Sequence, residues 1–157
     1  MKQLPDLEPV SRTRTEGFLA AIARGVRRVR PLRAFLLWPV FTRPGYWFAT
    51  GSIFVYGLVL GGRFAKKNGI HCFTRLPKRA YGRGGTTIGA IYLTTDNDAD
   101  DVLEHEAEHK AQWKRYGLWF IPLYVAAGSE ARTNRFEVAA GLELGGYLRK
   151  RGEARNS

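Results

Sequence analysis

The feature that most constrains this fold is an uncharged run of 17 residues, Tyr46 to Gly62. Its length is at the lower limit for a helix that spans a bilayer. Four glycines interrupt it, and Tyr46 and Trp47 stand at one end, where aromatic side chains meet a membrane interface. The run therefore predicts a spanning helix, a helix or hairpin that dips into a membrane, or a helix buried in a protein core.

A basic segment precedes this apolar part. Its apolar side chains recur at helical spacing among arginines and predict a short amphipathic helix: Phe18, Leu19, Ile22 and Val26. That helix lies on a membrane surface or docks on the rest of the protein. We therefore divide the chain into a basic arm (1–33), an apolar helical segment that is a candidate membrane anchor (34–64) and a domain (65–157). The apolar stretch begins too far from Met1 for a cleaved signal peptide, so we expect a membrane-associated or cytoplasmic protein.

The net charge of +11 is unevenly distributed along the chain. Residues 1–95 carry 16 Lys and Arg against three acids, whereas residues 96–157 carry nine against 11. This asymmetry indicates an anionic partner, either nucleic acid or membrane headgroups. Nucleic acid is the weaker candidate, because the sequence has no groove-reading motif and no pattern of stacking aromatics. An anionic membrane surface remains as the expected partner besides a substrate.

The pentapeptide His-Glu-Ala-Glu-His uses two of the three histidines at the spacing that lets a helix hold one metal ion. Residues four apart lie above one another on a helix, so His105 and His109 converge. In this H-E-x-x-H pattern the histidines hold zinc, and the glutamate, here Glu106, is the general base toward a water activated by the metal. A single cysteine, Cys72, excludes a thiolate cluster, so further ligands must be histidine or carboxylate.

A catalytic zinc site has three protein ligands and one open position. Glu137 is the preferred third ligand, because it lies near the start of the next predicted helix, and antiparallel packing of the two helices would bring it to the histidines. His71, on a flanking strand, is the alternative ligand. Glu106 also has a second interpretation, because seven of the 14 acids fall between residues 96 and 108. In that case it is a surface charge paired with Lys110 at i,i+4.

The pentapeptide lies in a pattern of short strands and helices. Residues 70–76 and 86–94 are predicted strands, the second rich in β-branched side chains, and we expect them to pair in antiparallel fashion. A helix over about 99–116 carries the pentapeptide. A last helix, capped by Thr133 or Asn134, runs to about residue 148. The prediction is an α+β fold with an antiparallel strand pair, a metal-binding helix and a downstream glutamate helix, preceded by the basic, apolar helical segment.

The helix-borne HEAEH followed by EVAA resembles the gluzincin class of zinc metallopeptidases over about residues 86–141. The resemblance implies a short zincin-like core in which His105, His109 and Glu137 hold Zn²⁺ and Glu106 is the base. It also implies that the strand before the metal helix binds the peptide substrate by strand addition. The substrate-binding residues would then be Ile88, Gly89, Ala90, Ile91 and Tyr92. The runs GGTTIGAIYLT and HEAEHKAQWKRYG also resemble a group of small uncharacterised proteins with the same pattern.

These patterns predict a small zinc-dependent hydrolase, a peptidase acting on a peptide or protein substrate. The alternative is a non-catalytic module that binds a membrane or a protein through a zincin-like scaffold. In the peptidase, Glu106 would take a proton from water and later pass it to the leaving amine. The developing oxyanion needs a further donor, and the candidates are not ranked by sequence: Tyr116, Arg132, Arg135 and Tyr147.

Overall fold

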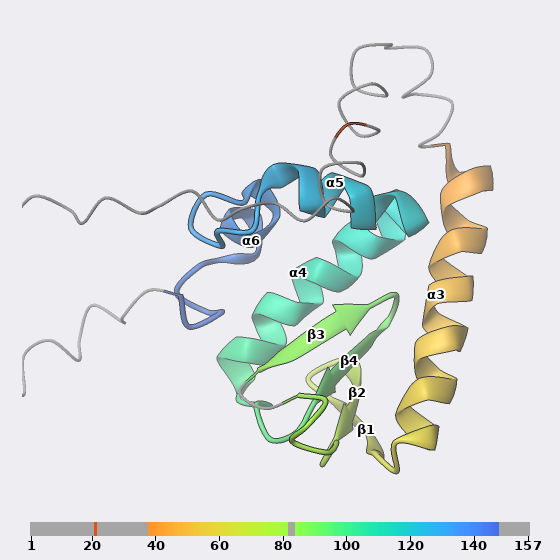
Figure 1. Cartoon of the computed structure of the whole chain (residues 1–157), viewed down its shortest axis with the longest axis vertical. Coiled ribbons are helices and arrows are strands. Elements are labelled where there is room, and N and C mark those ends of the chain that lie inside the picture. Colours follow the sequence, from red (N-terminus) through yellow and green to blue (C-terminus); the bar gives the residue numbers. More distant parts are fainter. Residues whose placement is uncertain (1–20, 22–37, 82–83, 148–157) are drawn as a thin grey trace, which may run out of the picture.

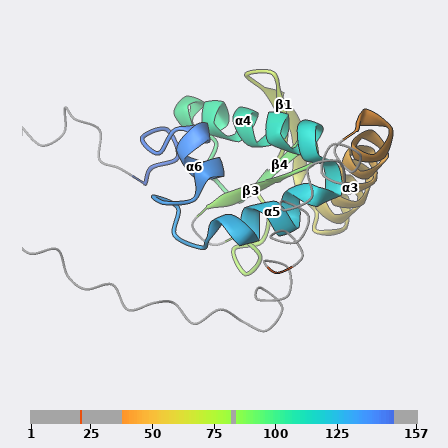
Figure 2. The same ribbon diagram turned by 90° about the horizontal axis from the view of Figure 1, so that it is seen from above.

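The computed structural model describes residues 38–81 and 84–147, together with residue 21 alone. The predicted amphipathic arm therefore lies outside the described residues, apart from that single position. The described chain forms a small mixed sheet with helices packed around it (Figures 1 and 2). It is an α+β structure, as the sequence predicts.

The sheet has four strands in the order β1-β2-β4-β3. The strands are β1 (Arg63–Lys67), β2 (Ile70–Thr74), β3 (Gly85–Ile88) and β4 (Ile91–Thr94). The pairs β1-β2 and β3-β4 are antiparallel hairpins, and β2 and β4 are parallel. The outer strands of the sheet are β1 and β3.

The prediction of one strand over residues 86–94 was wrong. The segment is a hairpin, in which Gly89 and Ala90 separate β3 from β4. Gly89 has a φ of +61°, which a residue with a side chain rarely adopts, and this allows the chain to reverse within two residues. The expected antiparallel pairing of the two predicted strands was therefore also wrong. After the turn, β4 runs parallel to β2 and pairs with it.

Helix α4 (Asp100–Tyr116) covers one face of the sheet and carries the pentapeptide, as predicted (Figure 1). Its Leu103 belongs to the same buried cluster as Cys72 and Tyr92. The neighbouring residues Phe73 and Leu93 point to the other face, because side chains alternate along a strand. Acids in the first turn and Lys and Arg in the last turn of α4 suit the helix dipole.

Helix α3 (Pro39–Val59) packs against the face of the sheet opposite α4. Gly57 lets α3 approach closely, since a Cβ there would lie 2.5 Å from the ring of Phe73. The helix begins seven residues before the uncharged run, and it contains Pro44. In the described part of the chain, none of the helices combines the length and the hydrophobicity that a membrane span requires. One side of α3 is buried and the other is exposed.

Three short helices follow α4: the 3-10 helix η1 (Gly117–Trp119), α5 (Phe120–Ala127) and α6 (Arg135–Ala140). Asn134 caps α6 as predicted, with its side chain accepting a hydrogen bond from the backbone N–H of Phe136. The predicted extension of this helix to residue 148 was wrong. The helix ends at Gly141, whose φ of +92° is incompatible with continuing the helix.

Candidate metal centre

Three buried side chains that the sequence predicts as ligands lie together. His105 and His109 project from α4, and Glu137 projects from the first turn of α6. Their nearest atoms are 3.1 Å apart between the two Nε2 atoms, 3.2 Å from His105 Nε2 to Glu137 Oε2, and 3.4 Å from His109 Nε2 to Glu137 Oε1. The group could hold a metal ion. The alternative ligand His71 does not join it, because its ring stacks on Phe64 of β1 instead.

The imidazole of His105 is oriented by the end of α6. Its Nδ1 lies 3.2 Å from the carbonyl oxygen of Ala140 and 3.1 Å from that of Gly141. A carbonyl can only accept, so Nδ1 carries the proton and Nε2 of the neutral ring presents a lone pair to the cluster. Gly145 packs on the same ring, since a Cβ there would lie 2.7 Å from Cε1 of His105.

The imidazole of His109 is oriented by a side chain of its own helix. Its Nδ1 lies 3.0 Å from Oε1 of Gln112, and Nε2 of Gln112 donates to the carbonyl oxygen of Phe136 at 3.0 Å. The second bond fixes which end of the amide faces the histidine, so Nδ1 of His109 is a donor and its Nε2 also presents a lone pair. Such outer partners set the tautomer of metal-binding histidines.

The carboxylate of Glu137 is stabilised in its charged form. Burial alone would raise its pKa, but the close approach of the two imidazoles and of the Tyr124 hydroxyl outweighs burial and lowers the pKa well below its usual range. The hydroxyl of Tyr124 donates to Oε1, whereas Oε2 accepts no hydrogen bond from the described residues. Two imidazole lone pairs and one carboxylate therefore face one another, an arrangement that needs a proton or a metal cation at its centre.

Glu106 is buried and lies beside the same cluster, with an exposed fraction of 7 %. Its burial raises its pKa, against the opposing influence of Thr87 and the two histidines. Its Oε2 has no hydrogen-bond partner among the described residues. The interpretation of Glu106 as a surface charge is wrong, since Lys110 reaches instead to the carbonyl oxygen of Gly69.

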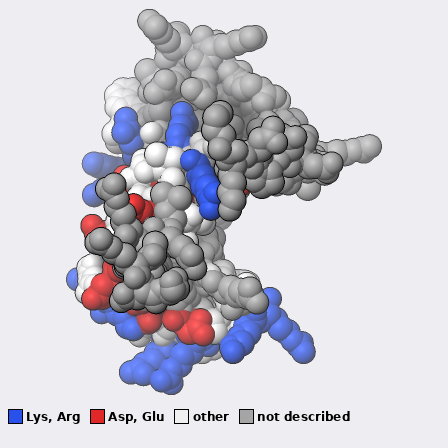
Figure 3. Space-filling model, turned by 90° about the vertical axis from the view of Figure 1, so that its left-hand side faces the viewer, with Lys and Arg blue, Asp and Glu red and all other residues white. Residues whose placement is uncertain are grey.

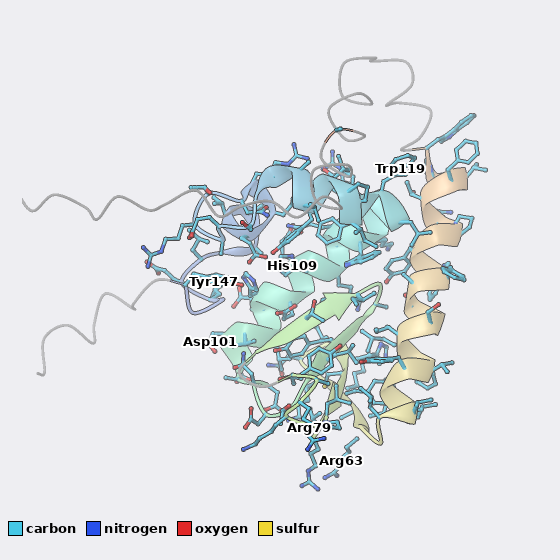
Figure 4. All side chains as sticks on the ribbon, in the orientation of Figure 1. Arg63, Arg79, Asp101, His109, Trp119 and Tyr147 are labelled. Carbon is cyan, nitrogen blue, oxygen red and sulfur yellow. The ribbon has the colours of Figure 1, made fainter. Side chains whose placement is uncertain are left out.

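A cavity of about 400 Å³ opens over the three candidate ligands and Glu106. One wall is the outer strand β3, and the opposite wall is apolar and comes mainly from α5. Figure 4 shows His109 in the middle of α4 and Tyr147 on the segment beyond α6, on the same side of the molecule. The remaining lining side chains are Trp113, Phe120, Ile121, Tyr124, Val125 and Tyr147.

The five predicted substrate-binding residues are only partly at this cavity. Ile88 lines it. Gly89 and Ala90 form the hairpin turn, where the backbone N–H of Ala90 bonds to Thr50 Oγ1 of α3. Ile91 and Tyr92 are buried in β4, an interior strand whose two edges are both paired. The prediction placed the open edge too far along the chain, because it treated the hairpin as one strand; the edge is β3.

A hydrogen bond from a side chain of α4 helps to hold the edge strand β3. The indole Nε1 of Trp113 donates to the carbonyl oxygen of Thr87 at 2.8 Å. This carbonyl therefore points away from β4, and it already has a donor. A peptide that adds to the edge has to use the other outward backbone groups of β3.

Of the four predicted oxyanion donors, Tyr147 is the one that lines the cavity. Its ring lies 5.9 Å from that of His105, edge to face. Tyr116 stacks on Phe120, and both arginines are exposed: Arg132 and Arg135.

Sequence reasoning did not identify Gln112 or Tyr124 as part of the site. The position of Gln112, three residues after His109 on one helix face, is a signal that could have found it. Tyr124 carries no such signal, because it reaches Glu137 only through the packing of α5 against α6.

Comparisons of the chain with protein-family models, with curated proteins and with solved structures give no match.

Proposed function

We propose that this protein is a zinc-dependent peptidase with a short zincin-like core. The observation that supports the proposal is the spacing of the three candidate ligand atoms. Donors that bind a tetrahedral zinc ion at about 2.0–2.1 Å are about 3.3 Å from one another. The separations within the cluster are 3.1, 3.2 and 3.4 Å. Two imidazoles and one carboxylate are also a donor set that catalytic zinc sites use.

The zinc ion would be held by His105, His109 and Glu137, and when bound it would polarise a substrate carbonyl and lower the pKa of a water molecule. Glu106 takes the proton of the attacking water, and its raised pKa brings it closer to neutral pH, where a general base is most effective. It then transfers that proton to the leaving amine. Tyr147 lines the cavity, and its hydroxyl would donate to the developing oxyanion.

Two features of the cavity favour a peptide as substrate. The outer strand β3 offers backbone groups that can pair with an extended chain. The apolar wall formed by Phe120, Ile121 and Val125 suits one large apolar side chain of that peptide. We therefore expect cleavage beside a bulky apolar residue in unfolded chains, which can adopt the extended conformation.

The proposal is tested by metal content and hydrolysis measured on the same preparations. Purified protein should contain one zinc per chain, and His105→Ala and Glu137→Ala should each remove it. Glu106→Gln should retain zinc but lose cleavage of an unstructured peptide mixture. The matched control is Glu104→Gln, the same change at an exposed position of α4, which should keep both properties. A Glu106→Gln variant with full activity would exclude Glu106 as the base, and zinc retention without hydrolysis in the wild type would favour the non-catalytic module.

A further inference from the structure

The outward side of α3 is apolar and exposed. The exposed fractions are 64 % for Trp47, 68 % for Phe48, 58 % for Val55 and 78 % for Val59. No charged residue occurs between Pro44 and Leu60. A helix on the surface of a soluble domain usually places charged and polar side chains on its solvent side. A continuous apolar strip of this kind marks a surface that binds something.

The buried side of α3 restricts how this surface can be used. Tyr46, Ala49 and Gly57 are buried against the rest of the protein, and Thr50 holds the hairpin turn through Ala90. The helix cannot leave this packing without opening the core. It therefore offers its outer side while lying flat along the domain, at the right of Figure 1.

Cations flank the apolar strip, and the chain segment that forms the strip contains no acid. Residues 38–81 contain no Asp or Glu. Arg43 stands near the first turn of α3, and Arg63 follows its last turn. Arg63 and Arg79 project at the end of the molecule where α3 ends (Figure 4), and Figure 3 shows Lys and Arg at that same end with acidic side chains next to them. Two acids, Asp96 and Asp98, line a pocket together with Arg63. Within the described part of the chain neither Arg63 nor Arg79 forms an ion pair, whereas Lys67 is paired with Asp98.

We propose that α3 lies in the surface of an anionic lipid bilayer, with Trp47, Phe48 and Val55 inserted among the acyl chains and the flanking cations at the headgroups. Interfacial helices bind in this way, through buried apolar area and attraction to anionic lipid. Charge distinguishes this partner from a second copy of the chain, because a dimer through α3 would bring two acid-free, basic segments together.

Vesicle flotation of the full chain tests the apolar strip. The protein should float with phosphatidylcholine vesicles that contain phosphatidylglycerol and bind vesicles of pure phosphatidylcholine more weakly. Trp47→Glu and Val55→Glu should each weaken binding at least tenfold. Both side chains are exposed, so the fold should be retained, which circular dichroism checks. Ala111→Glu is the matched control, since it adds the same charge at an exposed position of α4 and should bind as the wild type does.

The cations are tested by their neutralisation. Each basic charge near an anionic surface contributes about 1 kcal/mol, so Arg63→Gln and Arg79→Gln should each weaken binding to the anionic vesicles about fivefold. Lys114→Gln removes a charge from exposed α4 and should leave binding unchanged. Raising the salt concentration should reduce the difference between the two vesicle types.

Two results would overturn the proposal. Unchanged flotation of both Trp47→Glu and Val55→Glu would place the binding elsewhere, such as in residues 1–37. Sedimentation as a dimer that Trp47→Glu dissociates, without any vesicle binding by the wild type, would assign the surface to a second copy. Neither result depends on the metal or on hydrolysis, so the peptidase proposal stands or fails separately.

Discussion

At the residue scale, the site depends on two protons held at the Nδ1 atoms of the candidate ligands. The Nδ1–H of His105 donates a hydrogen bond to carbonyl oxygens at the end of α6, and the Nδ1–H of His109 donates one to Gln112. Both Nε2 atoms are thereby left as acceptors pointing at Glu137. The groups around the cluster therefore determine which nitrogen of each histidine is free to bind a metal ion.

Gln112 gives a prediction that a purely structural residue would not. In Gln112→Leu, His109 loses the acceptor for its Nδ1 proton, so zinc affinity should fall about 10- to 100-fold. Gln112→Glu keeps an acceptor at that position and should retain most of the affinity. Competition with a chelating dye measures both constants. Equal losses in the two variants would show that packing, and not the hydrogen bond to His109, is what matters.

A second residue-scale prediction concerns Tyr147. Tyr147→Phe removes the hydroxyl and keeps the ring that contacts His105. Because the hydroxyl would donate to the developing charge, kcat should fall about 10²-fold or more, with little change in KM. A steady-state comparison with the wild type on one peptide measures this. A variant with wild-type kcat would remove Tyr147 from the mechanism.

The residues of the pentapeptide and Glu137 could be predicted because their spacing and their position near a helix start are local signals. Gln112 could have been added from its place on the same face of α4. Tyr124 could not have been predicted, because its contact with Glu137 depends on how α5 packs against α6, and no local sequence pattern indicates that packing. The position of Tyr147 at the cavity has the same origin, since it comes after the unpredicted end of α6.

At the scale of elements, two glycines with positive φ decide where the strands and helices end. Gly89 turns one predicted strand into a hairpin, and Gly141 stops α6 after six residues. Each has a functional consequence. The first makes β3 the outer strand beside the cavity, and the second directs a carbonyl at His105. The sequence contains both glycines, but their conformation is fixed by contacts with distant residues.

The hairpin turn can be tested by adding a methyl group. In Gly89→Ala the new Cβ would meet the backbone N of Thr50 at 2.7 Å, in addition to the strain of its φ of +61°. Gly61→Ala is the matched control, with a φ of +71° and no atom within 4 Å. Strain alone should cost about 1–2 kcal/mol in both variants, and Gly89→Ala should lose more. Thermal unfolding measures the stability of both variants. Equal losses of stability would mean that α3 shifts at little cost to accommodate the new methyl group.

At the scale of the whole molecule, the candidate centre joins parts of the chain that are far apart in sequence. Helix α4 supplies two of the candidate ligands, α6 the third, and α5 a hydroxyl that bonds to it. These last helices are short, and the chain folds back over α4 to place them (Figure 2). A cation at the cluster should therefore stabilise the folded state, because the unfolded chain does not bring the three side chains together.

Removal of the metal should lower the melting temperature. Free zinc at 1,000 times its dissociation constant adds about 4 kcal/mol to the free energy of unfolding. For a chain of this size that corresponds to a shift of about 8–16 °C. Chelator-treated protein should melt lower by this order, and added zinc should restore the difference. Glu137→Ala should show no response to zinc, and a response equal to that of the wild type would mean that the metal binds elsewhere.

The proposed zinc centre can be observed directly in an anomalous difference map from a crystal, collected above and below the zinc absorption edge. We expect one peak within about 2.2 Å of Nε2 of His105, Nε2 of His109 and one carboxylate oxygen of Glu137, with Glu106 beside it. Density that shows these three side chains bonded only to one another, in crystals grown with zinc, would contradict this expectation.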